Sequence, residues 1–210
     1  MNNPVCLVSG SSSGIGSAIV RRFAAQGYDV TVHYNSGKDP SDPRSHKKPG
    51  AERATVIADE IHQEHDVEAI ALGADLGEPE AAFDLVDRTH EHFGRLDTVV
   101  SNSGVTNFVV DEAGKAVRYR FHETPIEHLA KEMDRVLSIN LMGAYRLCQR
   151  SLKLMMDQAE QDRQRGEEPR HRSILFVGSI SDVAPDSMRI PYGVSKAGLN
   201  HAVQGAAFEG

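Results

Sequence analysis

A segment rich in glycine and serine, residues 9–16, separates a short apolar run from a stretch with helical periodicity. Val5 to Val8 form the apolar run, and apolar residues recur at helical spacing from Ile15 until Gly27. A strand that passes through a glycine turn into a helix leaves the backbone N–H groups of the helix N-terminus open to an anion. The segment therefore favours an α/β fold that binds a phosphorylated ligand.

Strand and helix patterns alternate along the rest of the chain. Expected strands cover 30–34, 67–72, 96–100 and 173–177; expected helices cover 51–64, 78–93, 126–161 and 192–208; and 109–121 is expected to be a small hairpin. The strands expected at 5–8, 30–34, 67–72 and 96–100 are apolar almost throughout, as expected of a parallel sheet that is covered on both faces. We predict one doubly wound, Rossmann-type domain over residues 1–210, with three α/β/α layers and a ligand crevice at the carboxyl ends of the strands.

Composition limits the classes of partner. The chain has 210 residues and a net charge of −7, which argues against a general affinity for nucleic acid or an anionic membrane. No stretch approaches the roughly 18 apolar residues of a membrane span, and no signal peptide pattern is seen. Cys6 and Cys148 stand in apolar stretches, as expected of reduced core residues. We expect a cytoplasmic protein with a small-molecule ligand.

The glycine spacing in the turn is that of a dinucleotide site. Gly10 can make the tight turn, Gly14 lets the backbone approach a phosphate, and Gly16 permits close packing of the helix on the sheet. A turn of this composition is often only a loop, but its place between a strand and a helix favours cofactor binding. We expect the cofactor to contact Ser9, Gly10, Ser12, Ser13, Gly14, Ile15 and Gly16.

The end of the second strand bears on which dinucleotide binds. An NAD site usually has an acid there, bonded to the ribose 2′-hydroxyl. Here the strand ends His33-Tyr34-Asn35, with Tyr34 expected beside the cofactor. A 2′-phosphate is tolerated, and Lys38 or the other basic residues of 36–50 can pair with it, although they would equally suit a solvated loop. We predict NADP, with NAD as the less favoured alternative.

Tyr192 and Lys196 stand four residues apart, so they share one face of the last predicted helix. A lysine ammonium about 4 Å from a phenolate stabilises it by roughly 4 kcal/mol at an effective dielectric near 20, which makes the phenol a better proton donor at neutral pH. Ser179 follows the fifth strand, so its hydroxyl is expected to face the same crevice.

Four motifs, in this order, resemble those of the short-chain dehydrogenase/reductase family. The turn resembles Thr-Gly-x-x-x-Gly-x-Gly, with Ser9 in place of threonine, and Ser101-Asn102-Ser103-Gly104 resembles Asn-Asn-Ala-Gly. Asn140 resembles the family's active-site asparagine. Gly178-Ser179 and Tyr192-x-x-x-Lys196 resemble the catalytic serine and the Tyr/Lys pair. The resemblance covers residues 4–208.

The resemblance implies a role for each catalytic residue. Tyr192 would protonate a carbonyl oxygen as a general acid, and Ser179 would donate a hydrogen bond to the same oxygen. Lys196 would bind the nicotinamide ribose and assist Tyr192. Asn140 would hold a water that links Lys196 to solvent, unless it only satisfies buried backbone.

The resemblance also implies contacts to the cofactor. Asp75, followed by Leu76, would bind the adenine amino group, unless it only caps the helix that follows. Asn102 and Gly104 would line the cofactor cleft. No metal is expected, because His62, His65, His90 and His92 fall on polar helix faces without a set of acidic or cysteine ligands.

The chain departs from the family in three places. Insertions are expected at 36–50, beside the 2′-phosphate pocket, and at 106–122, near the substrate mouth. The family continues past the last helix with two more strands, whereas 14 residues follow Lys196 here. We therefore expect a truncated C-terminus and an exposed edge at 173–177.

Within the family, the sequence most resembles 3-oxoacyl-[acyl-carrier-protein] reductases, which implies NADPH-dependent reduction of a ketone by a homodimer or homotetramer. Two alternatives stay open. One is an NAD-linked alcohol or sugar dehydrogenase. The other is a non-catalytic nucleotide-binding protein, if the chain ends at Gly210. A serine hydrolase is disfavoured, because no Gly-x-Ser-x-Gly motif surrounds Ser179.

Overall fold

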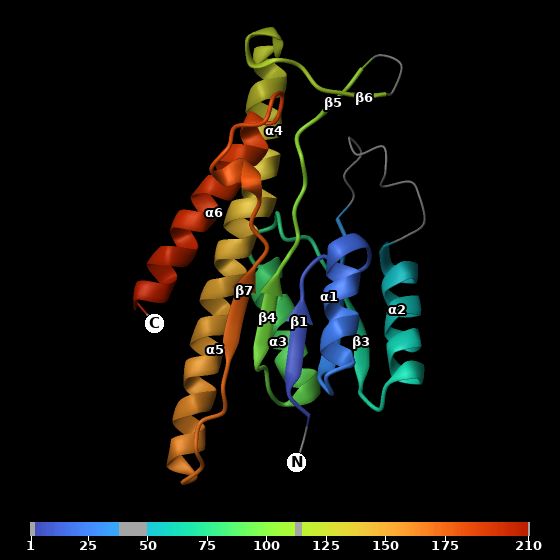
Figure 1. The fold of residues 1–210 in the computed structure, drawn as a ribbon, viewed down its shortest axis with the longest axis vertical. Coiled ribbons are helices and arrows are strands. Elements are labelled where there is room, and N and C mark those ends of the chain that lie inside the picture. The colour runs from blue at the N-terminus through green and yellow to red at the C-terminus, as the bar shows by residue number, and fades with distance from the viewer. Residues whose placement is uncertain (1–2, 38–49, 112–114, 210) are drawn as a thin grey trace.

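A computed structural model of the protein describes residues 3–37, 50–111 and 115–209. Five strands form a parallel sheet in the order β3-β2-β1-β4-β7 (Figure 1). Their bounds are β1 Val5–Val8, β2 Asp29–Asn35, β3 Ala69–Ala74, β4 Thr98–Ser101 and β7 Ser173–Phe176. Because β1 lies between β2 and β4, the chain leaves β1 in one direction and returns past it to continue in the other. The predicted doubly wound sheet is therefore confirmed.

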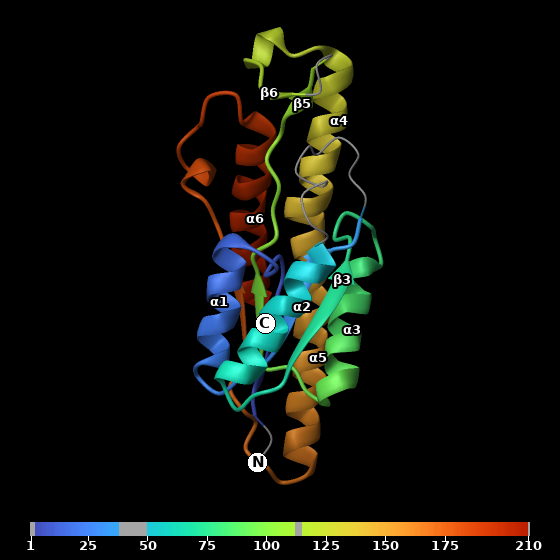
Figure 2. The same ribbon diagram turned by 90° about the vertical axis from the view of Figure 1, so that its right-hand side faces the viewer.

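The two faces of the sheet are covered by different helices (Figures 1 and 2). Cys6 and Val8 of β1 pack toward α1 (Gly14–Ala24) and α2 (Gly50–Glu64), whereas Val5 and Leu7 pack toward α3 (Ala81–Phe93) and α5 (Ala144–Gln164). Alternate residues of one strand thus enter two separate cores, which explains why β1 is apolar throughout. Both predicted core cysteines, Cys6 and Cys148, are buried and free.

The long helix expected at 126–161 is one rod made of three parts. It begins as α4 (Ile126–Leu137), passes through a π-helical turn η2 (Ser138–Gly143) and continues as α5. The rod extends well past the end of the sheet (Figure 1). Single π-helical turns are rare inside helices and frequent at functional sites. The turn places Asn140 between the two α-helical parts.

The remaining elements lie around the carboxyl ends of the strands. The predicted hairpin is present as β5 (Val109–Val110) and β6 (Ala116–Val117), and a 3-10 turn η1 (Phe121–Glu123) leads into α4. A second 3-10 turn, η3 (Ile180–Asp182), follows β7, and α6 (Ile190–Glu209) is the last helix. Most predicted boundaries are within two residues. The helix expected from residue 78 begins at Ala81, because Asp75 and Glu78 first form a turn.

β7 is an edge strand of the described sheet, and its Leu175 side chain is exposed, as predicted for this segment. Among the described residues, no helix has both the length and the apolar character that a membrane crossing requires.

Candidate functional site

The carboxyl ends of β1, β2, β4 and β7 meet at one end of the sheet, and most of the predicted site residues gather there. The turn after β1 has the backbone that its glycines predict. Gly10 and Gly14 have φ values of +68° and +56°, a region that side chains with a Cβ rarely adopt. Nothing lies within 4 Å of the position that a Cβ on Gly14 would occupy, so the backbone there is open to a ligand. A Cβ on Gly16 would lie 2.4 Å from the Gly10 carbonyl oxygen.

The N-terminus of α1 is suited to an anion. Ser13 precedes the helix in extended conformation and makes no side-chain capping bond, and the first turn contains no acid. The Ile15 side chain is 67% exposed. The first backbone N–H groups of a helix have no partner within the helix, so these groups can bind a pyrophosphate. The turn and helix therefore fit the phosphate part of a dinucleotide.

Ser9 and Asn102 connect the glycine turn to the end of β4 by hydrogen bonds. The buried Ser9 hydroxyl oxygen accepts the backbone N–H groups of Asn102 and Ser103, both at 2.9 Å. The Asn102 side-chain amide nitrogen donates to the Ser9 carbonyl at 2.9 Å and to the Gly10 carbonyl at 3.3 Å. Asn102 thus joins the end of β4 to the glycine turn. From the sequence we expected Asn102 to line the cofactor cleft and did not predict these bonds.

His33 near the end of β2 is 2% exposed and contacts the turn directly. Its Nδ1 accepts the Gly10 N–H at 2.8 Å, and its Nε2 lies 3.2 Å from the Ala74 carbonyl oxygen. Burial lowers the pKa of His33 to about 4, although the bond to Ala74 opposes this shift. The sequence prediction used His33 only as evidence that no acid is present. A histidine inside an apolar strand was the available signal for this contact.

Tyr34 and Arg53 lie beside the same strand end. The Tyr34 ring packs against the backbone of Gly73 in β3. Arg53 of α2 places its Nε 3.4 Å from the Ser12 carbonyl oxygen, so a guanidinium lies at the glycine turn. The sequence prediction missed Arg53, which stands in the first turn of the helix after β2. Lys38 and the rest of the basic segment at 38–49 lie outside the described residues.

Asp75 and Leu76 form the turn after β3. The Asp75 carboxylate accepts the Gly77 N–H at 3.0 Å, and the Asp75 carbonyl accepts the Glu78 N–H at 2.9 Å. Leu76 is buried, and its backbone packs against Gly143 of the π-helical turn. Asp75 therefore supports the turn before α3 and does not cap that helix, whose N-cap residue is Glu80.

Tyr192 and Lys196 lie on consecutive turns of α6. The Lys196 side chain is 4% exposed; its Nζ donates to the Val177 carbonyl at 2.8 Å and lies 5.9 Å from the centroid of the Tyr192 ring. Burial lowers the pKa of Lys196, and the Asp182 carboxylate partly opposes this shift. The structure thus places a buried amine near a half-buried phenol.

Ser179 lies at the start of η3, two residues after the carbonyl that Lys196 binds. Its hydroxyl oxygen accepts the Ser181 N–H at 3.2 Å. The Ser181 carbonyl lies against Gly193, the residue after Tyr192. The turn that carries Ser179 therefore packs on the turn of α6 that carries Tyr192.

Asn140 is completely buried beneath this region. Its side-chain oxygen accepts the Val105 N–H at 2.8 Å, and its amide nitrogen donates to the Val105 carbonyl at 2.8 Å and to the Ser195 hydroxyl at 3.0 Å. A Cβ on Gly104 would lie 3.5 Å from the Asn140 oxygen and 3.9 Å from Lys196 Nζ. Asn140 thus joins the segment after β4 to α6 and stabilises buried backbone, as its structural alternative proposed.

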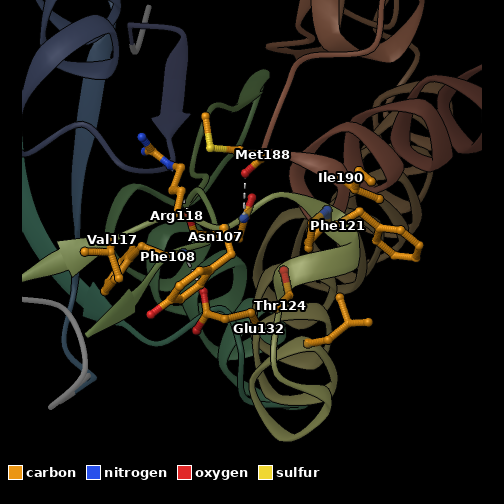
Figure 3. Close-up of a pocket in the computed structure, with 12 residues that line it drawn as sticks. Asn107, Phe108, Val117, Arg118, Phe121, Thr124, Glu132, Met188 and Ile190 are labelled. Atoms are coloured by element: carbon orange, nitrogen blue, oxygen red, sulfur yellow. Dashed lines mark hydrogen bonds between the residues drawn. The ribbon is translucent and has the colours of Figure 1, made fainter. Parts of the chain in front are cut away.

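A small pocket opens between the 106–122 segment, α4 and the start of α6 (Figure 3). Its cavity volume is about 30 Å³, and apolar side chains dominate its wall, among them Phe108, Phe121 and Ile190. The Asn107 amide nitrogen donates to the Met188 carbonyl at 3.0 Å across it. Met188 has a φ of +59°, which is strained for a residue with a side chain.

A buried ion pair between Glu132 and Arg135 lies at this pocket, and Glu132 forms part of its wall. The Glu132 carboxylate accepts the Phe108 N–H at 2.8 Å and pairs with Arg135 at 2.9 Å. The Arg135 guanidinium lies 4.9 Å from the centroid of the Phe108 ring. Pro191, the neighbour of Tyr192, also lines the pocket, so the insertion lies beside the predicted substrate region. The sequence prediction did not identify Asn107 or Glu132.

Two of the four histidines considered as metal ligands bond to other groups. His92 pairs with Glu68 at 2.7 Å, and the His62 ring bonds to the Val67 carbonyl at 3.0 Å. Within residues 3–37, 50–111 and 115–209, no group of three or more histidine, cysteine or acidic side chains could hold a metal ion.

Comparisons with known proteins place the chain among known families. The family model described as short chain dehydrogenase matches residues 4–210. Glucose 1-dehydrogenase 2 of Bacillus subtilis (strain 168) is 29% identical over 199 residues, which are 95% of this chain and 63% of the relative. L-rhamnose 1-dehydrogenase (NAD(P)(+)) of Azotobacter vinelandii is 31% identical over 201 residues, covering 96% of this chain and 65% of the relative. The chain thus spans less than two thirds of the length of these relatives.

A solved structure shows the same fold. A short chain dehydrogenase from Burkholderia cenocepacia J2315, in complex with NADP, superposes with a TM-score of 0.73 and is 27% identical. The alignment covers 99% of this chain and 69% of the other.

Proposed function

The chain belongs to the short-chain dehydrogenase family, and from this premise we propose that it reduces a ketone to a secondary alcohol with NADPH. The observation that carries the proposal is the pair on α6, in which the buried Lys196 amine lies 5.9 Å from the centroid of the Tyr192 ring, beside the turn of Ser179. A phenol, an amine and a hydroxyl at the carboxyl ends of parallel strands suit proton transfer to a carbonyl oxygen.

The proposed reaction gives each of the three residues a separate task. NADPH, when bound, would supply the hydride. Tyr192 donates its proton to the ketone oxygen, and Ser179 holds that oxygen by a hydrogen bond as negative charge develops. Lys196 is fixed by the Val177 carbonyl, so its amine stays near the phenol and near the expected position of the ribose.

NADP is preferred to NAD because of the charges at the end of β2. His33 and Tyr34 stand where an NAD site usually has an acid, and the Arg53 guanidinium lies at the glycine turn. The end of β2 itself carries no acid in sequence, and an arginine nearby suits a 2′-phosphate. The solved relative from B. cenocepacia is a complex with NADP, which supports the same choice.

For the substrate we propose a 3-oxoacyl thioester or a similar ketone. The wall of the pocket beside Pro191 is mostly apolar, which suits contact with the carbon atoms next to a ketone better than contact with a sugar ring; at about 30 Å³ the pocket has room for only a small part of such a substrate. An NAD-linked sugar dehydrogenase is the second candidate, because the relatives from B. subtilis and A. vinelandii are named as sugar dehydrogenases.

Assembly as a homodimer or homotetramer stays a proposal. Three large apolar side chains are exposed on the long helix: Met142 in the π-helical turn, and Tyr145 and Met156 on α5. A subunit interface commonly covers side chains of this kind. The molecular mass of the protein in solution tests this assembly.

The experiment follows the absorbance of NADPH with acetoacetyl thioester as substrate. We expect consumption of NADPH, tighter binding of NADPH than of NADH, and no oxidation of glucose or rhamnose. Tighter binding of NADH, together with sugar oxidation, would support the second candidate. Bound NADPH without turnover of any of these substrates would instead support a nucleotide-binding protein without catalysis.

A further inference from the structure

The His33 side chain has two hydrogen-bond partners with opposite requirements. The Gly10 N–H can only donate, so the Nδ1 that lies 2.8 Å away must be unprotonated. The Ala74 carbonyl can only accept, so the Nε2 that lies 3.2 Å away must carry the hydrogen. The two partners therefore select one neutral tautomer of a side chain that is 98% removed from solvent.

The His33 backbone makes two further bonds to the same turn. Its N–H donates to the Ser11 hydroxyl oxygen at 2.9 Å, and its carbonyl accepts the Ser12 N–H at 3.2 Å. The Ser11 hydroxyl in turn donates to the Val8 carbonyl at 2.7 Å. Three consecutive residues of the glycine turn, 10 to 12, are thus bonded to one residue of β2.

We propose that His33 is a positioning residue of the cofactor site, which holds the glycine turn open for the pyrophosphate through the acceptor nitrogen that it presents to Gly10. This inference rests on the proposed dinucleotide binding. Gly10 has the positive φ that begins the turn, and a partner for its N–H fixes the direction in which the next residues run. The second bond, to Ala74 of β3, keeps the imidazole from rotating away from Gly10.

Two substitutions separate the acceptor from the rest of the side chain. The oxygen of an asparagine lies close to the position of a histidine Nδ1, whereas the amide nitrogen of a glutamine lies close to that of Nε2. H33N can therefore keep the bond to Gly10, and H33Q can keep only the bond to Ala74. H33L keeps neither bond.

The test measures the dissociation constant for NADPH by the fluorescence of the bound nicotinamide. We expect H33N to bind within about threefold of the wild type, and H33Q and H33L to bind roughly tenfold more weakly, which corresponds to one hydrogen bond. T31V is the matched control. Thr31 is buried two residues earlier on the same side of β2 with no partner for its hydroxyl, so T31V should bind as the wild type does.

Thermal unfolding of each variant without cofactor separates positioning from stability. Equal NADPH affinity of H33N and H33Q at comparable melting temperatures would overturn the inference. Wild-type affinity in H33L would do the same.

A measurement without any variant covers the case in which these proteins do not fold. Nitrogen-15 NMR of the wild-type imidazole should show Nε2 protonated and Nδ1 unprotonated, and the opposite tautomer would refute the inference. Failure of the wild type to bind NADPH would instead remove the proposed function, and the NMR result would then still report on the contact between His33 and Gly10.

Discussion

Lys196 and Tyr192 come from consecutive turns of α6, with the amine nitrogen 5.9 Å from the centroid of the ring. The amine donates a hydrogen bond to the Val177 carbonyl, just after β7, at 2.8 Å. One helix and one strand end thus determine where this phenol and this amine lie. The proposed chemistry depends on this arrangement, and the other predictions concern residues that support the surrounding site.

Removing the Asn140 side chain should cost stability more than chemistry. N140A leaves the N–H and carbonyl of Val105 without their buried partners, and we expect a loss of about 3 kcal/mol in the free energy of unfolding. Urea titration measures this loss. N200A, on an exposed part of α6, is the control and should change stability by less than about 0.5 kcal/mol. A fully stable N140A that has lost turnover would instead support the water-holding role.

The bond from Asn107 to Met188 should affect the substrate and leave the cofactor site unchanged. N107A and N107D both remove the donor to the strained Met188 backbone, which can then relax and change the wall of the pocket. We expect the KM for the ketone to rise several-fold, which corresponds to the free energy of about one hydrogen bond. The dissociation constant for NADPH should not change. Steady-state kinetics with separate cofactor titration measures both. An unaltered KM in both variants would exclude this role for the pocket.

His33 should make stability depend on pH in the acid range. Its pKa in the folded protein is about 4, below the ordinary 6.5, so the unfolded chain takes up a proton more readily. The stabilising contribution is complete above pH 6.5 and is lost as the pH falls toward 4, by about 3 kcal/mol in total.

Urea unfolding at a series of pH values between these limits measures this dependence. H33N has no titrating group at this position, so the difference in unfolding free energy between the wild type and H33N should change by that amount across the range. A constant difference would show that burial does not control the protonation of His33.

The strands of the sheet were predictable because each is a short apolar run that is local in sequence. β1 has the predicted bounds, and the apolar runs of the other strands place them to within about two residues. The π-helical turn was not predictable. Leu137, Leu141 and Leu147 form an apolar stripe both in a regular α-helix and in a helix with one additional residue in a turn, so the pattern does not distinguish the two. The start of α3 was predicted too early for a similar reason. The turn at Asp75 depends on hydrogen bonds that periodicity does not report.

The site was predictable where a motif fixes both residue type and spacing, as for Gly10, Gly14 and the pair on α6. His33, Arg53 and Asn107 were missed, because each acts across a distance in sequence that only the folded chain closes. Asn102 was expected to line the cofactor cleft, and Asn140 either to hold a water or to satisfy buried backbone; the hydrogen bonds of both side chains to protein backbone could not be read from the sequence. A buried amide next to an active site serves the backbone first, because unpaired backbone groups are costly.

The most direct test of the central claim is turnover of the ketone by Y192F, with NADPH binding measured on the same protein. The substitution removes only the proton donor, so we predict that activity falls by at least about 100-fold while the dissociation constant for NADPH stays within about twofold. Y28F, just before β2 at the end of the sheet opposite the site, is the control and should keep full activity. Wild-type turnover in Y192F would contradict the account, because the proton would then come from another group.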